Sequence, residues 1–298
     1  QVAGIMAALS PQQDWFKNLR LAEMVLETFA KNPEIDNAMV AYQEKINNAK
    51  YLTDFKAAQK LEGVKKNAAV EKAKKTKGEA DIVTERLRTY IGKNLSEVPV
   101  RDKVYFARLA NDSRGNKDYN VVRPDGITVS RAVKADGQPA KVAWGSYKEI
   151  GKAVSIYFNG SNENISQQLG VQHKVRNFYN NIIDPMSNNG DVTIDTHAVA
   201  AALLLGLAGQ SKQVLQNFGQ EGGGSSGPAG ISGTYHAYSD AYADAAKRLG
   251  LLPRQVQSIT WEAVRGLFEK TFKQNPENKK KVNDVWVDFQ NGKINIDE

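Results

Sequence analysis

The chain of 298 residues contains no cysteine and only three histidines. Disulfides, thiolate nucleophiles, iron–sulfur clusters and cysteine-based zinc sites are therefore excluded, and a histidine-based metal site has few candidate ligands. A chain of this length can bury a substantial core, as one large domain or two modest ones. We therefore expect a fold built on apolar packing, with no metal and no cofactor.

The charge balance is basic. Forty Lys and Arg residues against 33 Asp and Glu residues give a formal net charge of +7, and the sequence pI is near 9.3. A basic balance favours polyanionic partners such as DNA, RNA or an anionic membrane surface. No apolar run approaches the roughly 18 residues needed to cross a bilayer, so we expect no membrane span.

Apolar residues recur at helical spacing along much of the chain, which predicts a mainly α fold. The first helical stretch is broken at Ser10, which is predicted to cap a helix that begins at Pro11. Further helices are predicted over residues 147–159, 165–183, 196–207, 239–249 and 253–272. A lysine-rich tail follows, with a short terminal strand or helix.

Two segments of the first half have a different character. Residues 34–92 indicate long, lysine-rich helix, and residues 60–77 have little apolar face. Those lysines form either a solvated surface, which we favour, or a DNA-contacting one. Residues 101–144 combine β-type runs with turn signals, which indicates a small β-containing insert or long loops.

The stretch 169–197 carries the strongest signal for chemistry. A helix is predicted to end near Gly170, and after a tight turn a second helix begins at Lys174. So short a connection exposes backbone N–H groups at the start of the second helix, which suits phosphate binding. Asp195 is predicted to be the N-cap of an apolar helix opening at Thr196, where backbone donors hold its carboxylate ionised.

These residues resemble a known family. A Gly-Val-Gln-His-Lys turn, a helix and then Val-Thr-Ile-Asp-Thr-His are similar to the endonuclease III branch of the helix-hairpin-helix DNA glycosylase superfamily. In that family a Leu-Pro-Gly-Val-Gly-x-Lys hairpin precedes a Val-Asp-Thr-His motif. The resemblance implies that Lys174 is the nucleophilic lysine and that Asp195 is the essential aspartate.

The N-terminal stretch 6–14 resembles the family's Leu-Leu-Ser-x-Gln-x-x-Asp motif. The resemblance implies that Gln12 enters the duplex beside the vacated base, with Gln13 as the alternate. It also implies DNA contacts by the hairpin, at Gly170, Val171, Gln172, His173 and Arg176.

The chain departs from the family pattern at three hairpin positions. Leu169 stands where proline is usual, Gln172 replaces the second glycine, and Arg176 replaces a small residue. The family's cysteine cluster is also missing.

Three further side chains are candidates for the base pocket. Trp15 and Tyr179 could stack on a base, although core packing is the default interpretation for each. His197 is expected to be structural rather than catalytic.

The resemblance implies a mainly α fold of two helical lobes with a small β-containing insertion. Residues 1–30 and 145–275 would form the glycosylase domain, residues 31–144 the insertion, and residues 276–298 a C-terminal tail. Such an enzyme flips out its target nucleotide, because the sugar carbon is unreachable inside a stacked duplex. In this reaction the Asp195 carboxylate stabilises the positive charge that develops on the sugar. The neutral amine of Lys174 attacks the anomeric carbon of that sugar. Positive charge on His173 and Arg176 would help Lys174 to lose its proton.

The implied function is therefore a DNA glycosylase with AP-lyase activity that excises a base. The C-terminal part looks like phage-type relatives, which makes a modified base a reasonable target. We expect double-stranded DNA as the partner, a monomer, and the cytoplasm of a bacterial or phage-infected cell. Two alternatives stay open: a base-flipping enzyme that remodels a modified base without excision, and a non-catalytic DNA-binding protein on the same scaffold.

Overall fold

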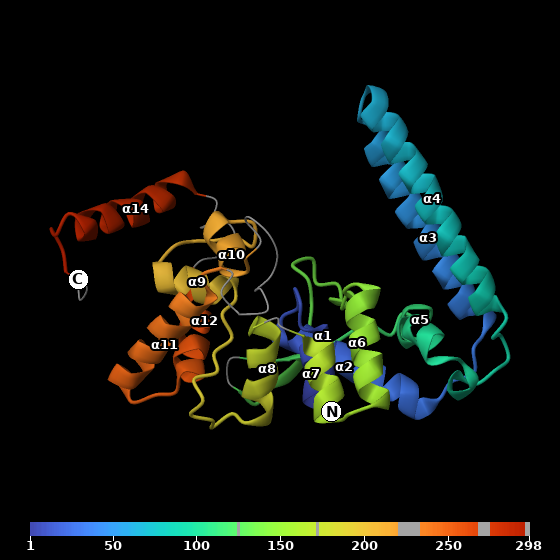
Figure 1. The fold of residues 1–298 in the computed structure, drawn as a ribbon, viewed down its shortest axis with the longest axis horizontal. Coiled ribbons are helices and arrows are strands. Elements are labelled where there is room, and N and C mark those ends of the chain that lie inside the picture. The colour runs from blue at the N-terminus through green and yellow to red at the C-terminus, as the bar shows by residue number, and fades with distance from the viewer. Residues whose placement is uncertain (124–125, 171–172, 220–232, 268–274, 296–298) are drawn as a thin grey trace. The chain divides into compact units, whose positions relative to one another are not determined.

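The computed structural model describes residues 1–123, 126–170, 173–219, 233–267 and 275–295. The chain divides into two compact units, Gln1–Gln168 and Leu169–Glu298 (Figure 1). Both units are built mainly from helices, and the sheet among the described residues has two strands. The prediction of a mainly α fold is confirmed. The predicted domain boundaries follow the family resemblance rather than packing, and they stay a prediction.

The first unit begins with helices and carries the strands near its middle. Its elements in chain order are α1 (Val2–Leu9), α2 (Trp15–Lys31), α3 (Asn37–Gln59), α4 (Gly63–Arg88), the 3₁₀ turn η1 (Leu95–Glu97), α5 (Val100–Asp112), β1 (Asn120–Val122), β2 (Val129–Arg131), α6 (Tyr147–Phe158) and α7 (Asn162–Leu169).

Helix α1 lies at the centre of this unit, because nearly all of its residues are buried. It packs against α2 and α6. A Cβ on Gly4 would stand 3.2 Å from Ile156 and 3.3 Å from Ile165, so the glycine permits the close approach of α6 and α7. A second apolar cluster joins the bases of α3 and α4 to α5, with Met39, Leu87 and Phe106 fully buried.

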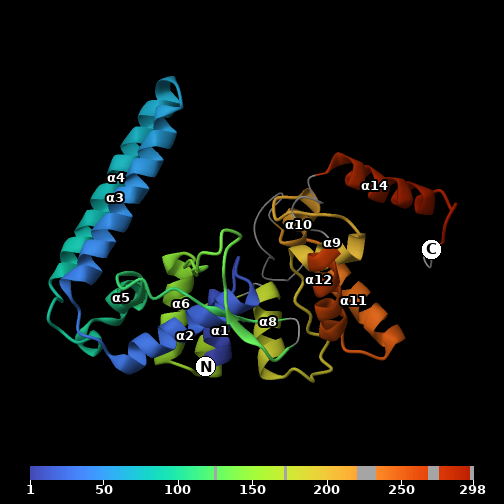
Figure 2. The ribbon, with the colours of Figure 1, turned by 180° about the vertical axis from the view of Figure 1, so that it is seen from behind.

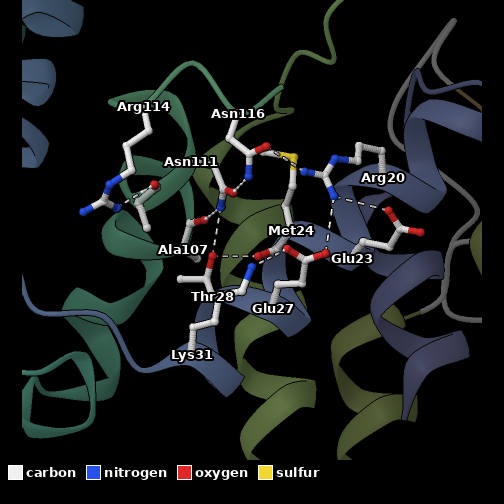
Figure 3. A network of polar contacts seen from close by, with 11 residues as sticks. Arg20, Glu23, Met24, Glu27, Thr28, Lys31, Ala107, Asn111, Arg114 and Asn116 are labelled. Atoms are coloured by element: carbon white, nitrogen blue, oxygen red, sulfur yellow. Dashed lines mark hydrogen bonds and ion pairs between the residues drawn. The ribbon is translucent and has the colours of Figure 1, made fainter. Parts of the chain in front are cut away.

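A chain of polar contacts ties α2 to α5 (Figure 3). The Asn111 side chain donates to the Thr28 hydroxyl at 2.8 Å, and Thr28 donates to the Met24 carbonyl at 2.7 Å. Asn116 donates to Asn111 at 3.0 Å and accepts from Arg20 at 3.1 Å. Because Thr28 and Asn111 are buried, these bonds satisfy groups that would otherwise destabilise the core.

The connection between α1 and α2 differs from the prediction. Ser10 does not cap a helix that begins at Pro11: it ends α1, and its hydroxyl donates back to the Ala7 carbonyl at 2.9 Å. Gln12 has a φ of 61°, which a continuing helix cannot accommodate. Asp14 is the actual cap of α2 and accepts from the Lys17 N–H at 3.0 Å.

Residues 34–92 are largely helical, as predicted, but they form two helices joined by a short turn. Gly63 follows that turn with a φ of +53°, a conformation that side-chain-bearing residues rarely adopt. Figures 1 and 2 show α3 and α4 lying side by side.

The prediction of strands or loops is wrong for the first part of residues 101–144, where α5 forms. Its buried side includes Asp102 and Lys103, which disguise the apolar spacing. Their partners come from other segments: Arg86 donates to the Asp102 carboxylate at 2.9 Å, and Lys103 donates to the Ser96 carbonyl at 3.0 Å. The predicted β content is confirmed further on, where Val122 in β1 pairs with Val129 in β2, antiparallel.

The second unit contains α8 (His173–Ile183), α9 (Thr196–Leu203), α10 (Lys212–Asn217), α11 (Tyr235–Leu249), α12 (Pro253–Leu267) and α14 (Pro276–Gln290). Helices α9, α11 and α12 pack on one another around a core that includes Val199, Ala246 and Val256. Where the structure describes the chain, no helix has the length and apolar character needed to span a bilayer.

Candidate functional site

The predicted hairpin joins α7 to α8. Gly170 follows α7 with a φ of +63°, the left-handed conformation in which glycine commonly ends a helix. Val171 and Gln172 lie outside the described residues, and α8 begins at His173. The Arg176 guanidinium donates to the Gly170 carbonyl, so this side chain holds Gly170 against the first turns of α8.

Lys174 is the second residue of α8 and is half-buried. Its amine makes no ion pair or hydrogen bond with any residue that the structure describes. Residues three and seven positions further along a helix share its face, and these are Asn177 and Asn181. The side of α8 that carries Lys174 is therefore the side that carries these two amides.

Three asparagines of α8 hold the segment that leads to Asp195. Asn177 donates to the Val192 carbonyl at 3.0 Å. Asn180 and Asn181 make the other bonds, to the Asp191 carboxylate at 2.9 Å and the Thr193 hydroxyl at 3.2 Å. The loop before Asp195 is thus attached along α8 by side-chain bonds.

The Tyr235 hydroxyl completes this attachment from α11. It donates to the Val192 carbonyl at 2.7 Å and accepts from the Ile194 N–H at 3.0 Å and from Asn177 at 3.1 Å. Burial raises the pKa of Tyr235 to about 12, so the phenol keeps its proton and remains a donor at neutral pH. The backbone immediately before Asp195 is therefore fixed from two helices.

Asp195 is the N-cap of α9, as predicted. Its Oδ1 accepts from the Ala198 N–H at 2.9 Å, and its Oδ2 accepts from the Trp261 indole N–H at 3.2 Å. The carboxylate is half-buried and receives one donor on each oxygen. Two independent bonds restrict its rotation and hold the negative charge at a defined place.

Trp261 is the member of this site that sequence reasoning missed. It lies on α12, 66 residues after Asp195, and its ring stands edge-on to His197 at 5.6 Å between centroids. This placement agrees with the structural role expected for His197. The available signal was weak: a tryptophan in an amphipathic helix is ordinarily a packing residue.

His173 packs between aromatic rings rather than standing free beside Lys174. Its ring stacks on Tyr235 at 5.4 Å and meets His236 edge-on at 5.0 Å. Burial lowers the pKa of His173 below its usual value of 6.5, and the charges of His236 and Arg176 lower it further. The imidazole is therefore neutral at pH 7, and of the two predicted sources of positive charge near Lys174, Arg176 is the one that remains.

Four further predicted residues belong to α8 or to the first unit. Tyr179 is half-buried on α8, five positions after Lys174, which places it on another side of the helix. The remaining three belong to the first unit. Gln12 is exposed, Gln13 donates to the Ala143 carbonyl at 3.1 Å, and Trp15 opens α2 with 46% of its surface exposed.

The second unit contains an amine that has no partner among the described residues and a carboxylate that two hydrogen bonds hold in place. Helix α8 carries Lys174, and its asparagines hold the loop that delivers Asp195. Such a pair can support nucleophilic attack at a carbon that develops positive charge, with the carboxylate stabilising that charge. Across the described residues, no group of three His, Asp or Glu side chains could hold a metal ion.

Comparison with known families gives one match. Residues 125–268, just under half of the chain, match a family model described as a family of unknown function, DUF7178. The matched region contains the α7–α8 turn, Lys174, Asp195 and Trp261. No match to the chain is found among curated proteins or among solved structures.

Proposed function

We propose that this protein is a DNA glycosylase with associated AP-lyase activity, acting as a monomer on double-stranded DNA. The observation that carries the proposal is that one helix, α8, both bears Lys174 and holds the loop that leads to Asp195. Helix α8 bears the amine, and Asn177 of the same helix face binds the Val192 carbonyl three residues before Asp195. The resemblance of this stretch to the endonuclease III branch supplies the reaction class.

The local backbone supports a helix-hairpin-helix interpretation of this stretch. Helix α7 ends at Leu169, a left-handed glycine follows, and α8 begins at His173, three positions after that glycine. A capping aspartate then opens a third helix. The first N–H groups of any helix have no partner within the helix, so the start of α8 suits a phosphate of the DNA backbone.

The proposed chemistry begins when the target nucleotide leaves the base stack. As the bond between the sugar carbon C1′ and the base breaks, positive charge grows on the sugar, and the Asp195 carboxylate stabilises it. The neutral Lys174 amine bonds to C1′ and the base departs with the bonding electron pair. Opening of the sugar ring then gives a Schiff base, from which β-elimination cleaves the strand.

Borohydride trapping on duplex DNA with one abasic site tests this proposal whichever base the enzyme removes. Borohydride reduces a Schiff base to a stable amine, so a lysine nucleophile leaves a covalent protein–DNA adduct. We expect the wild-type protein to give this adduct and Lys174→Ala to lose it. Lys212→Ala is the matched control, because Lys212 is an exposed lysine at the start of α10 in the same unit.

The alternatives give different results. Equal trapping by both variants would indicate adventitious reaction of surface amines and would reject Lys174. If the wild type gives no adduct, the lyase assignment fails. An enzyme that remodels a base would then leave a modified base and no abasic site. A non-catalytic protein would bind DNA equally well after Lys174→Ala and Asp195→Asn.

A further inference from the structure

The helical arm, defined as residues 37–88 with α3, α4 and their turn, extends away from the rest of the first unit (Figures 1 and 2). The structure describes all of its residues. Towards the turn, the two helices meet through small side chains, since Ala58 and Ala73 are the buried apolar residues there. The far part of the arm therefore exposes most of its surface.

Lysines in the far part of the arm differ in whether a carboxylate neutralises them. Three of the nine lysines between residues 50 and 77 form ion pairs: Lys50 with Asp54 at 2.8 Å, Lys74 with Glu71 at 2.9 Å and Lys77 with Asp81 at 2.5 Å. The other six form none with any residue that the structure describes; they are Lys56, Lys60, Lys65, Lys66, Lys72 and Lys75.

Three of the four unpaired lysines of α4 are gathered on its outer side, and the fourth, Lys66, lies nearer the side that faces α3. Lys65, Lys72 and Lys75 are all exposed, and their spacing places them within about 80° of one another around the helix. The buried Ala73 and Thr84 point to another side, towards α3. Lys72 and Lys75 are one turn apart, and unneutralised like charges at that spacing disfavour a helix. A polyanion on this side would remove that repulsion.

We propose that the outer side of the helical arm binds the phosphodiester backbone of a nucleic-acid duplex through Lys65, Lys72 and Lys75. This inference goes beyond the proposed catalytic function, since it needs neither Lys174 nor a particular base. It also revises the interpretation of residues 60–77 as a solvated surface. The arm lies outside the region that matches the family model.

Two other polyanionic partners fit the arm less well. Single strands are held by exposed aromatic rings that stack on bases, whereas the large exposed apolar side chains of the arm are aliphatic: Leu52, Leu61, Val64 and Ile82. Helices that lie on a membrane present one continuous apolar stripe. The four aliphatic side chains are scattered over both helices and their turn, and they provide no such stripe.

The test is the salt dependence of binding to a labelled DNA duplex. Because this duplex has no abasic site, the binding measurement is independent of any test of catalysis. Each phosphate contact contributes about 0.9 to the slope of log K against log salt. We expect the triple variant Lys65→Gln, Lys72→Gln, Lys75→Gln to make that negative slope shallower by about 2.7. Binding at low salt should weaken roughly tenfold or more. Glutamine keeps the helix propensity of lysine.

A matched control removes the same charge elsewhere. Lys31, Lys280 and Lys293 are exposed lysines on other segments, and each is paired with a carboxylate. Replacing these three with glutamine is expected to leave the slope nearly unchanged. A charge-conserving variant, with arginine at positions 65, 72 and 75, is expected to keep wild-type binding, and circular dichroism checks that helix content is unaltered.

Several results would overturn the proposal. Equal losses in the arm variant and the control would show a general effect of net charge. An unchanged slope in the arm variant, or no duplex binding by the wild type, would reject the arm as the contact. Binding of the wild type to phosphatidylserine vesicles but not to duplex would assign the arm to membranes. The same binding measurement with duplex RNA shows which of the two nucleic acids the arm prefers.

Discussion

At the scale of single residues, the Asp195 side chain has two roles. Its carboxylate caps α9 and also accepts from Trp261, so one side chain serves both the fold and the proposed chemistry. The two roles can be separated, because asparagine is as good an N-cap as aspartate but carries no charge.

We therefore predict that Asp195→Asn lowers the rate of Schiff-base trapping on abasic DNA by about 10²-fold, the cost of removing one electrostatic stabiliser. The free energy of unfolding should change by less than about 1 kcal/mol. Single-turnover trapping and urea denaturation measure the two quantities. Asp244→Asn, at an exposed aspartate on α11 in the same unit, is the control and should keep its rate. A large loss of stability in Asp195→Asn would mean that the charge serves the fold instead.

His173 makes the second residue-scale prediction, which concerns pH. Its folded pKa lies below the unfolded value of 6.5, so the folded state binds fewer protons between these two values. The stability that His173 contributes is therefore complete above about pH 6.5 and is lost as the pH falls through the folded pKa.

In His173→Phe, the ring can still stack on Tyr235 but no longer titrates. We expect the difference in unfolding free energy between pH 7 and pH 5 to shrink relative to the wild type. At pH 8 the variant should be at least as stable, because His173 Nε2 is buried and accepts or donates no hydrogen bond within the described structure. Urea denaturation at each pH tests this; an unchanged pH dependence would assign the titration to other groups.

At the scale of elements, polar side chains attach α8 to the loop before Asp195. Asn177, Asn180 and Asn181 reach the loop before Asp195, and Tyr235 of α11 binds the same backbone. Hydrogen bonds are directional, so this attachment sets the register between the helix that carries Lys174 and the loop that carries Asp195.

Tyr235→Phe removes the hydroxyl at the centre of that attachment. We predict a loss of about 1–3 kcal/mol in unfolding free energy, because the buried Ile194 N–H loses its acceptor. Trapping should fall as well, since Asp195 is no longer held in register. Tyr238→Phe, one turn further along α11, is the control and should lose less of both. Normal trapping in Tyr235→Phe would indicate that the asparagines suffice.

At the scale of the whole molecule, each compact unit has its own apolar cluster. Phe106 is fully buried in the first unit, and Val199 is fully buried in the second. Neither unit depends on a disulfide, since the chain has no cysteine, so stability within each unit rests on packing.

Phe106→Ala should cost about 3–5 kcal/mol, as for other large aromatic residues removed from a core. We expect the faster amide hydrogen exchange to be confined to residues 1–168, because the contacts of Phe106 lie within that unit. Val199→Ala should give the converse pattern in residues 169–298. Acceleration across both ranges in either variant would show that the chain unfolds as one cooperative body.

Much of the local structure follows from neighbours within a few residues. The end of α7 at Gly170, the start of α8 and the cap at Asp195 were all predictable, because helix ends depend on short-range hydrogen bonds and on glycine's freedom in left-handed conformations. Where the prediction from local sequence was wrong, the observed structure depends on a partner from a distant segment. Buried Asp102 and Lys103 of α5 hide the helical pattern of that segment until Arg86 and Ser96 are in place.

A mainly helical chain, the turn before Lys174 and the capping role of Asp195 could thus be derived from the order of the residues. Their surroundings could not: the Trp261 bond to Asp195 spans 66 residues, the Tyr235 bonds span 41 and 43, and burial lowers the pKa of His173. The physical reason is that capping and helical spacing are local. Desolvation and hydrogen bonding between distant segments arise after the chain has packed.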